Sequence, residues 1–173
     1  PFKVVLSTQQ RAAVAGAAYV TTQLRVGMMP ARRGDEYLGR RHGLIGQETT
    51  GVGGLAKALR TIPVILGIAR DLRETAPGAL LANFTNPAGL VAQALHDVGF
   101  ERVLGICDSA NGAQNAVSRF LGVPKAEVHH TVYGLNHLSW TPSVRVGCEA
   151  DGSGGEEVLP GLVADPRFVA QTH

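Results

Sequence analysis

The 173-residue sequence has a small net charge and no long apolar run, and each shortage excludes a class of protein. Sixteen basic residues against fourteen acidic ones leave a formal charge of +2, too balanced for a protein that neutralises the phosphates of nucleic acid or of a membrane surface. No apolar run approaches the roughly twenty residues that span a bilayer. We therefore expect neither nucleic acid nor a membrane among its partners.

Cysteine is also scarce. Cys107 and Cys148 are the only two in the sequence, too few for the multi-bridge framework of a small secreted protein. They indicate reduced thiols and a cytoplasmic location. Hydrophobic residues make up 45% of a chain long enough to bury a core, which predicts a globular protein.

The sequence begins at Pro1 without an initiator methionine, and Lys3–Leu6 already forms a short apolar run typical of a strand. Both features predict that the chain is an internal piece of a longer protein.

Strand and helix patterns alternate over the first two-thirds of the chain. The patterns predict strands at residues 18–23, 79–84 and 102–107 and helices at 9–15, 87–98 and 111–121. Such alternation is typical of an α/β fold with a parallel sheet covered by helices, whose ligands bind beyond the carboxyl ends of the strands.

Two segments interrupt this alternation. Residues 25–53 hold several glycines and arginines, which predicts a long irregular connection of functional importance. A long helix follows, in which Pro63 is expected to cause a kink. Its apolar positions at helical spacing are Leu55, Leu59, Ile62, Leu66, Ala69 and Leu72.

The pattern changes after Pro124. Alternating residues over 128–133 and again over 143–148 predict strands that follow one another directly. We therefore place a domain boundary near residue 125, with one domain over 1–125 and the start of another over 126–173.

Polar residues follow each predicted strand. These residues are Gln23, Arg25, Asn83, Asn86, Cys107 and Asp108. Because the carboxyl ends of parallel strands meet at one edge, we expect them to converge on a site.

Cys107 and His137 offer a thiolate and an imidazole to a divalent metal such as Mn, Fe or Zn. Two protein ligands leave positions open for water or substrate, as a Lewis-acid catalyst requires. Spacing alone equally allows a small buried cysteine and a hydrogen-bonded turn histidine.

Two arginine- and glycine-rich motifs have two interpretations each. Arg32 and Arg33 beside Asp35 and Glu36 could clamp a phosphate or form a solvated, salt-bridged loop. The glycine-rich segment 46–54 could present N–H groups to an anion at a helix N-terminus or serve as a flexible loop.

Six stretches of the sequence, in order along the chain, together carry a resemblance to a known protein family. They are TQLRVG (22–27), RRGDE (32–36), GLIGQETTGVGGLAKALRTIPV (43–64), NFTNPAG (83–89), GIC (105–107) and GLNHLSW (134–140). Together they resemble the NAD- and manganese-dependent family 4 glycosidases, in particular the 6-phospho-β-glucosidases.

This resemblance implies the C-terminal part of a Rossmann-like NAD-binding domain, followed by the start of an α+β substrate domain like that of lactate and malate dehydrogenases. The first βαβ unit, with its pyrophosphate-binding turn, is then expected before Pro1, and the tyrosine base beyond His173. We therefore expect the chain alone to be inactive and its full-length parent to be a homo-oligomer.

The resemblance also implies a role for individual residues. Cys107 and His137 resemble the metal ligands, and Arg32 and Asn86 the contacts to a phosphorylated sugar, with Asn136 beside that sugar. Glu48 resembles the acidic residue near the catalytic tyrosine, and Asp108 a general acid. We expect the strand-end residues Gln23, Arg25 and Asn83 to contact NAD.

The implied reaction is hydrolysis of a 6-phospho-β-glucoside by oxidation at C3, loss of the C2 proton, departure of the aglycone, addition of water and return of the hydride. Members that use NAD are exceptions to two-carboxylate glycoside hydrolysis.

Two alternatives remain open. Segments ALRTIPV (58–64), NFTNPAG and NHLSW resemble the β-specific branch, whereas an aspartate directly after the metal cysteine resembles the 6-phospho-α-glucosidases. A lactate- or malate-type dehydrogenase has a similar domain order, but it would show a catalytic histidine with an arginine and no thiolate ligand.

Overall fold

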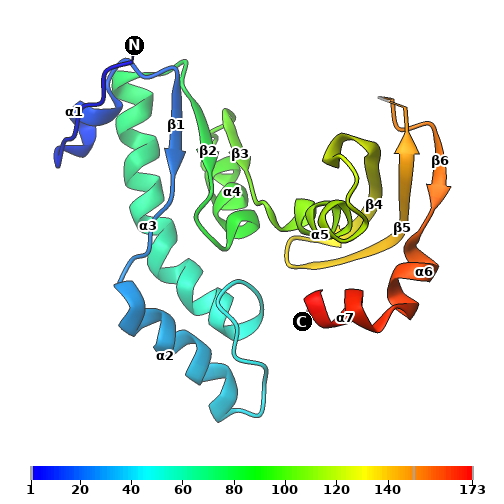
Figure 1. Cartoon of the computed structure of the whole chain (residues 1–173). Coiled ribbons are helices and arrows are strands. Elements are labelled where there is room, and N and C mark those ends of the chain that lie inside the picture. Colours follow the sequence, from blue (N-terminus) through cyan, green and yellow to red (C-terminus); the bar gives the residue numbers. More distant parts are fainter. Residues whose placement is uncertain (1, 150, 173) are drawn as a thin grey trace. The chain divides into compact units, whose positions relative to one another are not determined.

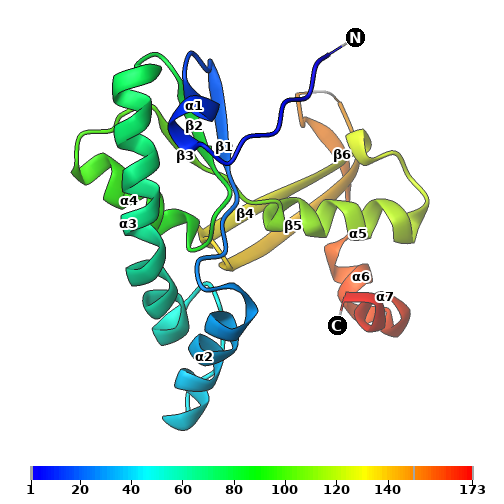
Figure 2. The ribbon, with the colours of Figure 1, turned by 90° about the vertical axis from the view of Figure 1, so that its left-hand side faces the viewer.

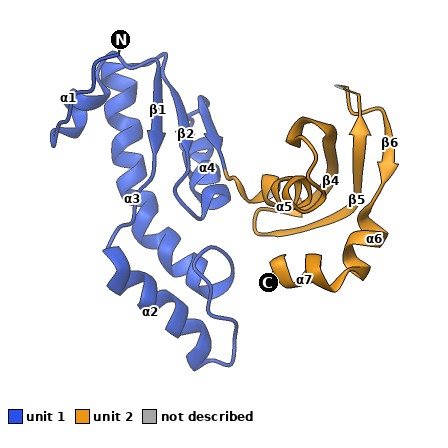
Figure 3. Ribbon diagram, viewed as in Figure 1, with its two compact units in different colours: residues 1–106 blue, residues 107–173 orange. Residues whose placement is uncertain are grey.

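A computed structural model describes residues 2–149 and 151–172 and divides the chain into two compact units (Figures 1 and 3). The first unit ends at Ile106 and the second begins at Cys107. Each unit has its own sheet and its own hydrophobic core.

The first unit is built on a parallel sheet of three strands in the order β1–β2–β3. The strands are β1 (Tyr19–Thr22), β2 (Leu80–Asn83) and β3 (Val103–Gly105). Thr22 is paired with Asn83, and Asn83 with Gly105, so the three carboxyl ends lie at the same edge of the sheet. The predicted parallel sheet is confirmed.

Helices α1 (Gln10–Val14), α2 (Met28–Arg41), α3 (Gly51–Thr75) and α4 (Ala88–Asp97) complete this unit. Ile65 and Leu72 of α3 are buried in one cluster with Leu81 of β2 and Leu95 of α4. This cluster is the hydrophobic core that the composition predicts.

Helix α2 corrects the expectation of an irregular connection over residues 25–53. Pro30 lies in the first turn of α2, where a backbone N–H has no intrahelical partner to lose. Gly39 allows the helix to approach the next loop, because a Cβ there would lie 2.9 Å from the carbonyl oxygen of Ile45. Gly39 thus serves close packing rather than irregular structure.

Helix α3 is continuous through Pro63 and changes direction about half-way along (Figure 1). The predicted stripe holds in the second half of the helix, where Ala69 and Leu72 are buried, but Leu55 and Leu59 are exposed. One buried row, spaced by three or four residues, consists of Gly54, Lys57, Thr61, Ile65, Ile68 and Leu72. A lysine therefore occupies a place in phase with the core residues.

Among the described residues, α3 is also a helix long and apolar enough to cross a membrane by length and composition. The expectation that no apolar stretch approaches a membrane span does not hold for it. Ile65, Ile68 and Leu72 are buried against the sheet, so packing in the core accounts for its apolar character.

Residues Lys3–Leu6 do not form the predicted strand within the described part of the chain, and Val4, Val5 and Leu6 are exposed. A strand requires a neighbour for its backbone groups, and in the described chain none pairs with this segment.

The second unit contains an antiparallel sheet in the order β4–β5–β6, with bounds Val128–Leu135, Leu138–Cys148 and Gly154–Glu157. Helix α5 (Gly112–Leu121) packs on β4 (Figure 2). The remaining elements are the short 3₁₀ helices Ser109–Asn111 and Lys125–Glu127 and the helices α6 (Leu159–Ala164) and α7 (Pro166–Thr172).

The observed division at Ile106/Cys107 differs from the boundary predicted near residue 125. Val117 of α5 is buried together with Val128 and Val144 of the second sheet. The Gln114 side chain also donates hydrogen bonds to the carbonyls of Lys125 and Val128. Helix α5 therefore packs with the strands that follow it. The assignment of NAD-binding and substrate roles to 1–125 and 126–173 stays a prediction.

Candidate active site

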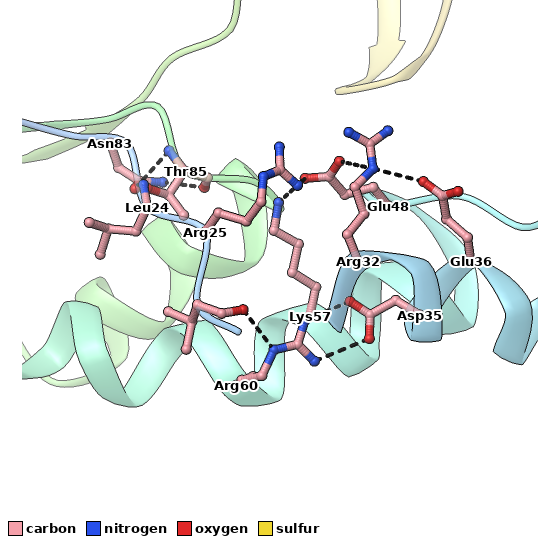
Figure 4. Close-up of polar contacts among 11 residues, drawn as sticks. Leu24, Arg25, Arg32, Asp35, Glu36, Glu48, Lys57, Arg60, Asn83 and Thr85 are labelled. Atoms are coloured by element: carbon pink, nitrogen blue, oxygen red, sulfur yellow. Dashed lines mark hydrogen bonds and ion pairs between the residues drawn. The ribbon is translucent and has the colours of Figure 1, made fainter. Parts of the chain in front are cut away.

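Glu48 is the centre of an ion-pair cluster in the first unit (Figure 4). Its Oε1 accepts a hydrogen bond from Arg25 Nη1 at 2.9 Å and another from the Lys57 ammonium group. Its Oε2 lies 3.0 Å from Arg32 Nε. Three cations from three separate segments thus surround one carboxylate, whose side chain is only 13% exposed.

The loop that carries Glu48 is held against the start of α3. A Cβ on Gly53 would lie 2.1 Å from the carbonyl oxygen of Gln47, and one on Gly54 would lie 2.4 Å from that of Thr49. Only glycine permits this approach. The two glycines therefore fix the backbone on both sides of Glu48, which explains the glycine-rich pattern of this segment.

The cations around Glu48 decide its protonation state. Burial acts to raise the pKa of Glu48, but the hydrogen bond and charge of Lys57, with the charges of Arg25 and Arg32, outweigh it and lower the pKa below 4.5. Glu48 is accordingly an ionised carboxylate at neutral pH, able to accept a proton or a hydrogen bond.

Arg32 is held by its Nε alone. That nitrogen donates to Glu36 Oε1 at 2.8 Å and lies beside Glu48, so two carboxylates fix the orientation of the guanidinium. Within the described part of the chain, neither terminal nitrogen of Arg32 forms a bond, and Figure 4 shows both directed away from the two carboxylates. The geometry leaves a two-nitrogen fork for an anion such as a phosphate.

A second ion pair braces the same region. Arg60 of α3 binds both carboxylate oxygens of the buried Asp35 of α2, at 3.1 and 2.6 Å (Figure 4). Its Nε donates to the carbonyl of Val26 at 3.0 Å. Arg60 therefore ties α2 and the segment after β1 to α3.

Asn83 connects the carboxyl ends of β1 and β2. The amide oxygen of this fully buried residue accepts hydrogen bonds from Thr22 Oγ1 at 2.9 Å and from the Thr85 N–H at 3.2 Å. Its amide nitrogen donates to the Thr85 carbonyl, and Thr85 Oγ1 accepts from Leu24 N–H. The side chain thus joins the loops that leave the two strands, and contact with a cofactor stays a prediction for it.

The other strand-end residues lie at the same edge. Gln23 is exposed beyond β1, and the half-buried Asn86 follows β2. Arg25 is bound to Glu48, as described above.

Cys107 and His137 come together in the second unit. His137 belongs to the two-residue turn between β4 and β5 and adopts a left-handed backbone with φ 59°. This conformation is uncommon for a residue with a side chain, and it often marks a functional position. His137 Nε2 lies 3.5 Å from Cys107 Sγ, which also lies 3.2 Å from Ser109 Oγ.

These two donors suit part of a divalent-metal site. Metal–nitrogen and metal–sulfur distances of about 2.0–2.3 Å allow donors 3.5 Å apart to bind the same ion. In residues 2–149 and 151–172, no group of three or more His, Cys, Asp or Glu side chains forms a complete site. The assignment of this pair as metal ligands therefore stays a prediction. Exposed Asp108 and Asn136 are their sequence neighbours.

Sequence reasoning missed Lys57 and Arg60. Lys57 carries a detectable signal, because it stands in phase with the buried stripe of α3 at a position that an apolar residue would normally occupy. The pairing of Arg60 with Asp35 depends on the packing of α2 on α3, which no local pattern reveals.

Comparison with known proteins gives the family. A model of the family 4 glycosyl hydrolases matches residues 1–123. This chain belongs to that family.

A probable 6-phospho-β-glucosidase of Bacillus subtilis (strain 168) is 42% identical over 168 residues, which are 96% of this chain and 37% of that protein. A 6-phospho-β-glucosidase of Thermotoga maritima, solved with manganese, NAD⁺ and glucose-6-phosphate, superposes with a TM-score of 0.80 at 35% identity, over 92% of this chain and 38% of that one.

A 6-phospho-α-glucosidase from gut microorganisms, solved with NAD and Mn²⁺, superposes with a TM-score of 0.79 at 34% identity, over 90% of this chain and 35% of that one. The chain thus spans about a third of the length of the relatives that it matches. These similarities confirm the Rossmann-like fold and the family predicted from the sequence.

Proposed function

We propose that the full-length protein hydrolyses 6-phospho-β-glucosides to glucose 6-phosphate and an aglycone, with NAD and a divalent metal such as Mn²⁺. The observation that carries this proposal is the approach of Cys107 Sγ to His137 Nε2, at 3.5 Å. A lactate- or malate-type dehydrogenase needs no thiolate ligand, so the pair favours the glycosidase. The identity of 42% to a probable 6-phospho-β-glucosidase supports the substrate class.

Arg32 is the residue that we assign to the phosphate group of the sugar. Its terminal nitrogens face away from the carboxylates that hold Nε, so a phosphate can accept two parallel hydrogen bonds without displacing Glu36 or Glu48. Asn86 offers an amide at the carboxyl edge of the sheet as a second contact. We place Asn136 beside the sugar, because it shares the turn of His137.

Glu48 is the charged group that we assign to the support of proton transfer. It is ionised and fixed by Lys57, Arg25 and Arg32, so it can accept a hydrogen bond from a neighbouring acid–base group and orient that group without prior rearrangement. Asp108 is exposed beside Cys107, and we assign it to protonation of the departing oxygen.

Cys107 and His137 would hold the metal, which when bound polarises an oxygen of the sugar on which negative charge develops. Gln23 and Arg25 would contact NAD at the carboxyl edge of the sheet, where parallel α/β folds bind dinucleotides. Asn83 fixes the ends of β1 and β2 at this edge. We expect it to contact NAD through the loop that follows β2, which its hydrogen bonds hold in place.

The test is turnover of the two anomers of nitrophenyl 6-phospho-glucoside by the full-length protein. We expect the β anomer to be cleaved and nitrophenol release to require both NAD and metal. Asp108→Asn should barely slow cleavage of this activated substrate, because nitrophenol leaves without protonation, but it should slow cleavage of a disaccharide phosphate. Cleavage of the α anomer alone would establish a 6-phospho-α-glucosidase instead.

The α-specific activity is a second candidate because of two observations. Asp108 directly follows the cysteine ligand, and the gut 6-phospho-α-glucosidase superposes almost as well as the β enzyme, with TM-scores of 0.79 and 0.80. Three segments that resemble the β-specific branch outweigh this single position.

A further inference from the structure

Lys57 is a buried cation at a position of α3 where a core would normally hold an apolar residue. It is 4% exposed and stands on the buried stripe of α3 between Gly54 and Thr61. Taking an ammonium group out of water is costly unless a partner and hydrogen bonds compensate for it. Within the described part of the chain, Glu48 is the acidic group that does so.

Stability alone does not explain such a pair. An apolar residue of similar volume at a buried ion pair is often neutral or stabilising, so a requirement for stability does not account for the charge of Lys57. The neighbouring position Thr61 is also polar and fully buried, and its Oγ1 has no partner among the described residues. This stretch of α3 is therefore polar on the face that elsewhere forms the core.

The three cations around Glu48 are not equivalent. The side chains of Arg25 and Arg32 are 36% and 37% exposed, whereas that of Lys57 is 5% exposed. Water screens the charges of exposed groups, so Lys57 exerts the strongest field on the carboxylate per unit of charge. Arg32 also divides its Nε between Glu48 and Glu36 and has its fork directed elsewhere.

We propose that Lys57 is a positioning residue that holds the Glu48 carboxylate ionised and in one place for the proposed reaction. This inference rests on the proposed role of Glu48, and Lys57 itself need not touch the substrate. The charged groups that face Glu48 are Arg25 after β1, Arg32 of α2 and Lys57 of α3, with Glu36 acting through Arg32.

The experiment compares Lys57→Met and Lys57→Arg in the full-length protein, with Arg70→Met as the matched control. Arg70 is an exposed cation of the same helix. The first readout is the pKa of the Glu48 carboxyl, followed by ¹³C NMR titration and assigned with Glu48→Gln. We expect Lys57→Met to raise this pKa by about one unit or more, and Lys57→Arg and Arg70→Met to leave it near the wild-type value.

The second readout is the pH profile of kcat/KM on the nitrophenyl substrate. The acidic limb should move to higher pH in Lys57→Met by the same amount as the NMR titration. In a Glu48→Gln background, Lys57→Met should add less than about a twofold loss, because its effect passes through Glu48. If Lys57→Met does not fold, Lys57→Gln keeps a polar side chain and removes the charge.

An unchanged Glu48 titration in the neutral variants would overturn the inference, as would an equal shift in Arg70→Met or additive losses in the double variant. Failure of the wild-type protein to cleave any 6-phospho-glucoside would instead refute the proposed function, while the NMR titration would still decide the part played by Lys57.

Discussion

The two units differ in how firmly they hold their candidate site residues before a ligand binds. In the first unit, Glu48 is enclosed by three cations, and its carboxylate is fixed before any ligand arrives. In the second unit, His137 sits on an exposed turn and lies 3.5 Å from the half-buried Cys107. The comparison teaches that the chain alone can fix a carboxylate, whereas two predicted metal ligands depend on a bound ion to hold them.

The metal ligands should give the largest effect. Cys107→Ser or His137→Ala in the full-length protein should remove the bound divalent ion and lower turnover by about a thousandfold or more, because electrophilic stabilisation contributes several kcal/mol. Metal content and nitrophenol release measure the two effects. Cys148→Ser, which alters the other free cysteine, should leave both unchanged. Near-normal turnover in a ligand variant with chelator present would show that the pair binds no catalytic ion.

Arg32 should give the next largest effect. Arg32→Ala should lower kcat/KM by at least roughly 10- to 100-fold, because even one hydrogen bond to a charged group contributes about 1.5–3 kcal/mol. Inorganic phosphate should protect wild type from heat, and it should not protect the variant. Arg33→Ala, which changes the exposed neighbour, is the control. Equal losses in both variants would indicate a general effect of charge rather than a fork at Arg32.

The Glu48 cluster should make the stability of the first unit depend on pH. The pKa of Glu48 is below its ordinary value of 4.5, so an unfolded chain binds the proton at higher pH than the folded one. The stabilisation is therefore fully present above about pH 4.5 and is lost as the pH falls through the lower folded value.

Glu48→Gln should flatten this dependence and cost about 1–3 kcal/mol at neutral pH, because Lys57 loses its charged partner. Thermal unfolding between pH 3 and 7 measures this dependence of stability on pH. Glu156→Gln, at an exposed position of β6, is the control. A dependence as steep as that of wild type would place the responsible carboxylate elsewhere.

Effects of similar size or smaller should come from two glycines of α2. Gly39→Ala should destabilise by about 1–3 kcal/mol, because the new Cβ would lie 2.9 Å from the Ile45 carbonyl oxygen. Gly34→Ala meets no atom within 4 Å and should stabilise by about 0.5–1 kcal/mol, through helix propensity. Denaturant unfolding distinguishes the pair. Equal effects at the two positions would mean that α2 is not held against the loop of Glu48.

Periodicity predicted the parallel sheet and its helices well. Leu81 and Val103 belong to continuous apolar runs, and such runs are buried in the core when the chain folds. The same reasoning failed for α2, because Gly39 and Pro30 break helices in isolation and are tolerated here through packing and position. It also selected Leu55 and Leu59 for the core, although both are exposed, because a helix that is apolar on several sides has no unique stripe.

For the site, local motifs and the family resemblance supplied Glu48, Arg32, Cys107 and His137. The contacts that orient these residues were not predicted. Lys57 is nine residues from Glu48 in the sequence, and Arg60 is twenty-five residues from Asp35. Such pairs depend on tertiary packing of helices, which a sequence pattern does not encode locally.

The buried amide of Asn83 has a consequence for local opening. Its oxygen and nitrogen act as a carbonyl and an N–H would, so the hydrogen-bonded ladder continues one step past the ends of β1 and β2. Strand ends usually fray, and their amide protons exchange with solvent quickly. Here the N–H groups of Leu24 and Thr85 are bonded to side chains of the same network. Their protons should therefore exchange more slowly than those of ordinary strand ends, so that the carboxyl edge opens no more readily than the middle of the sheet.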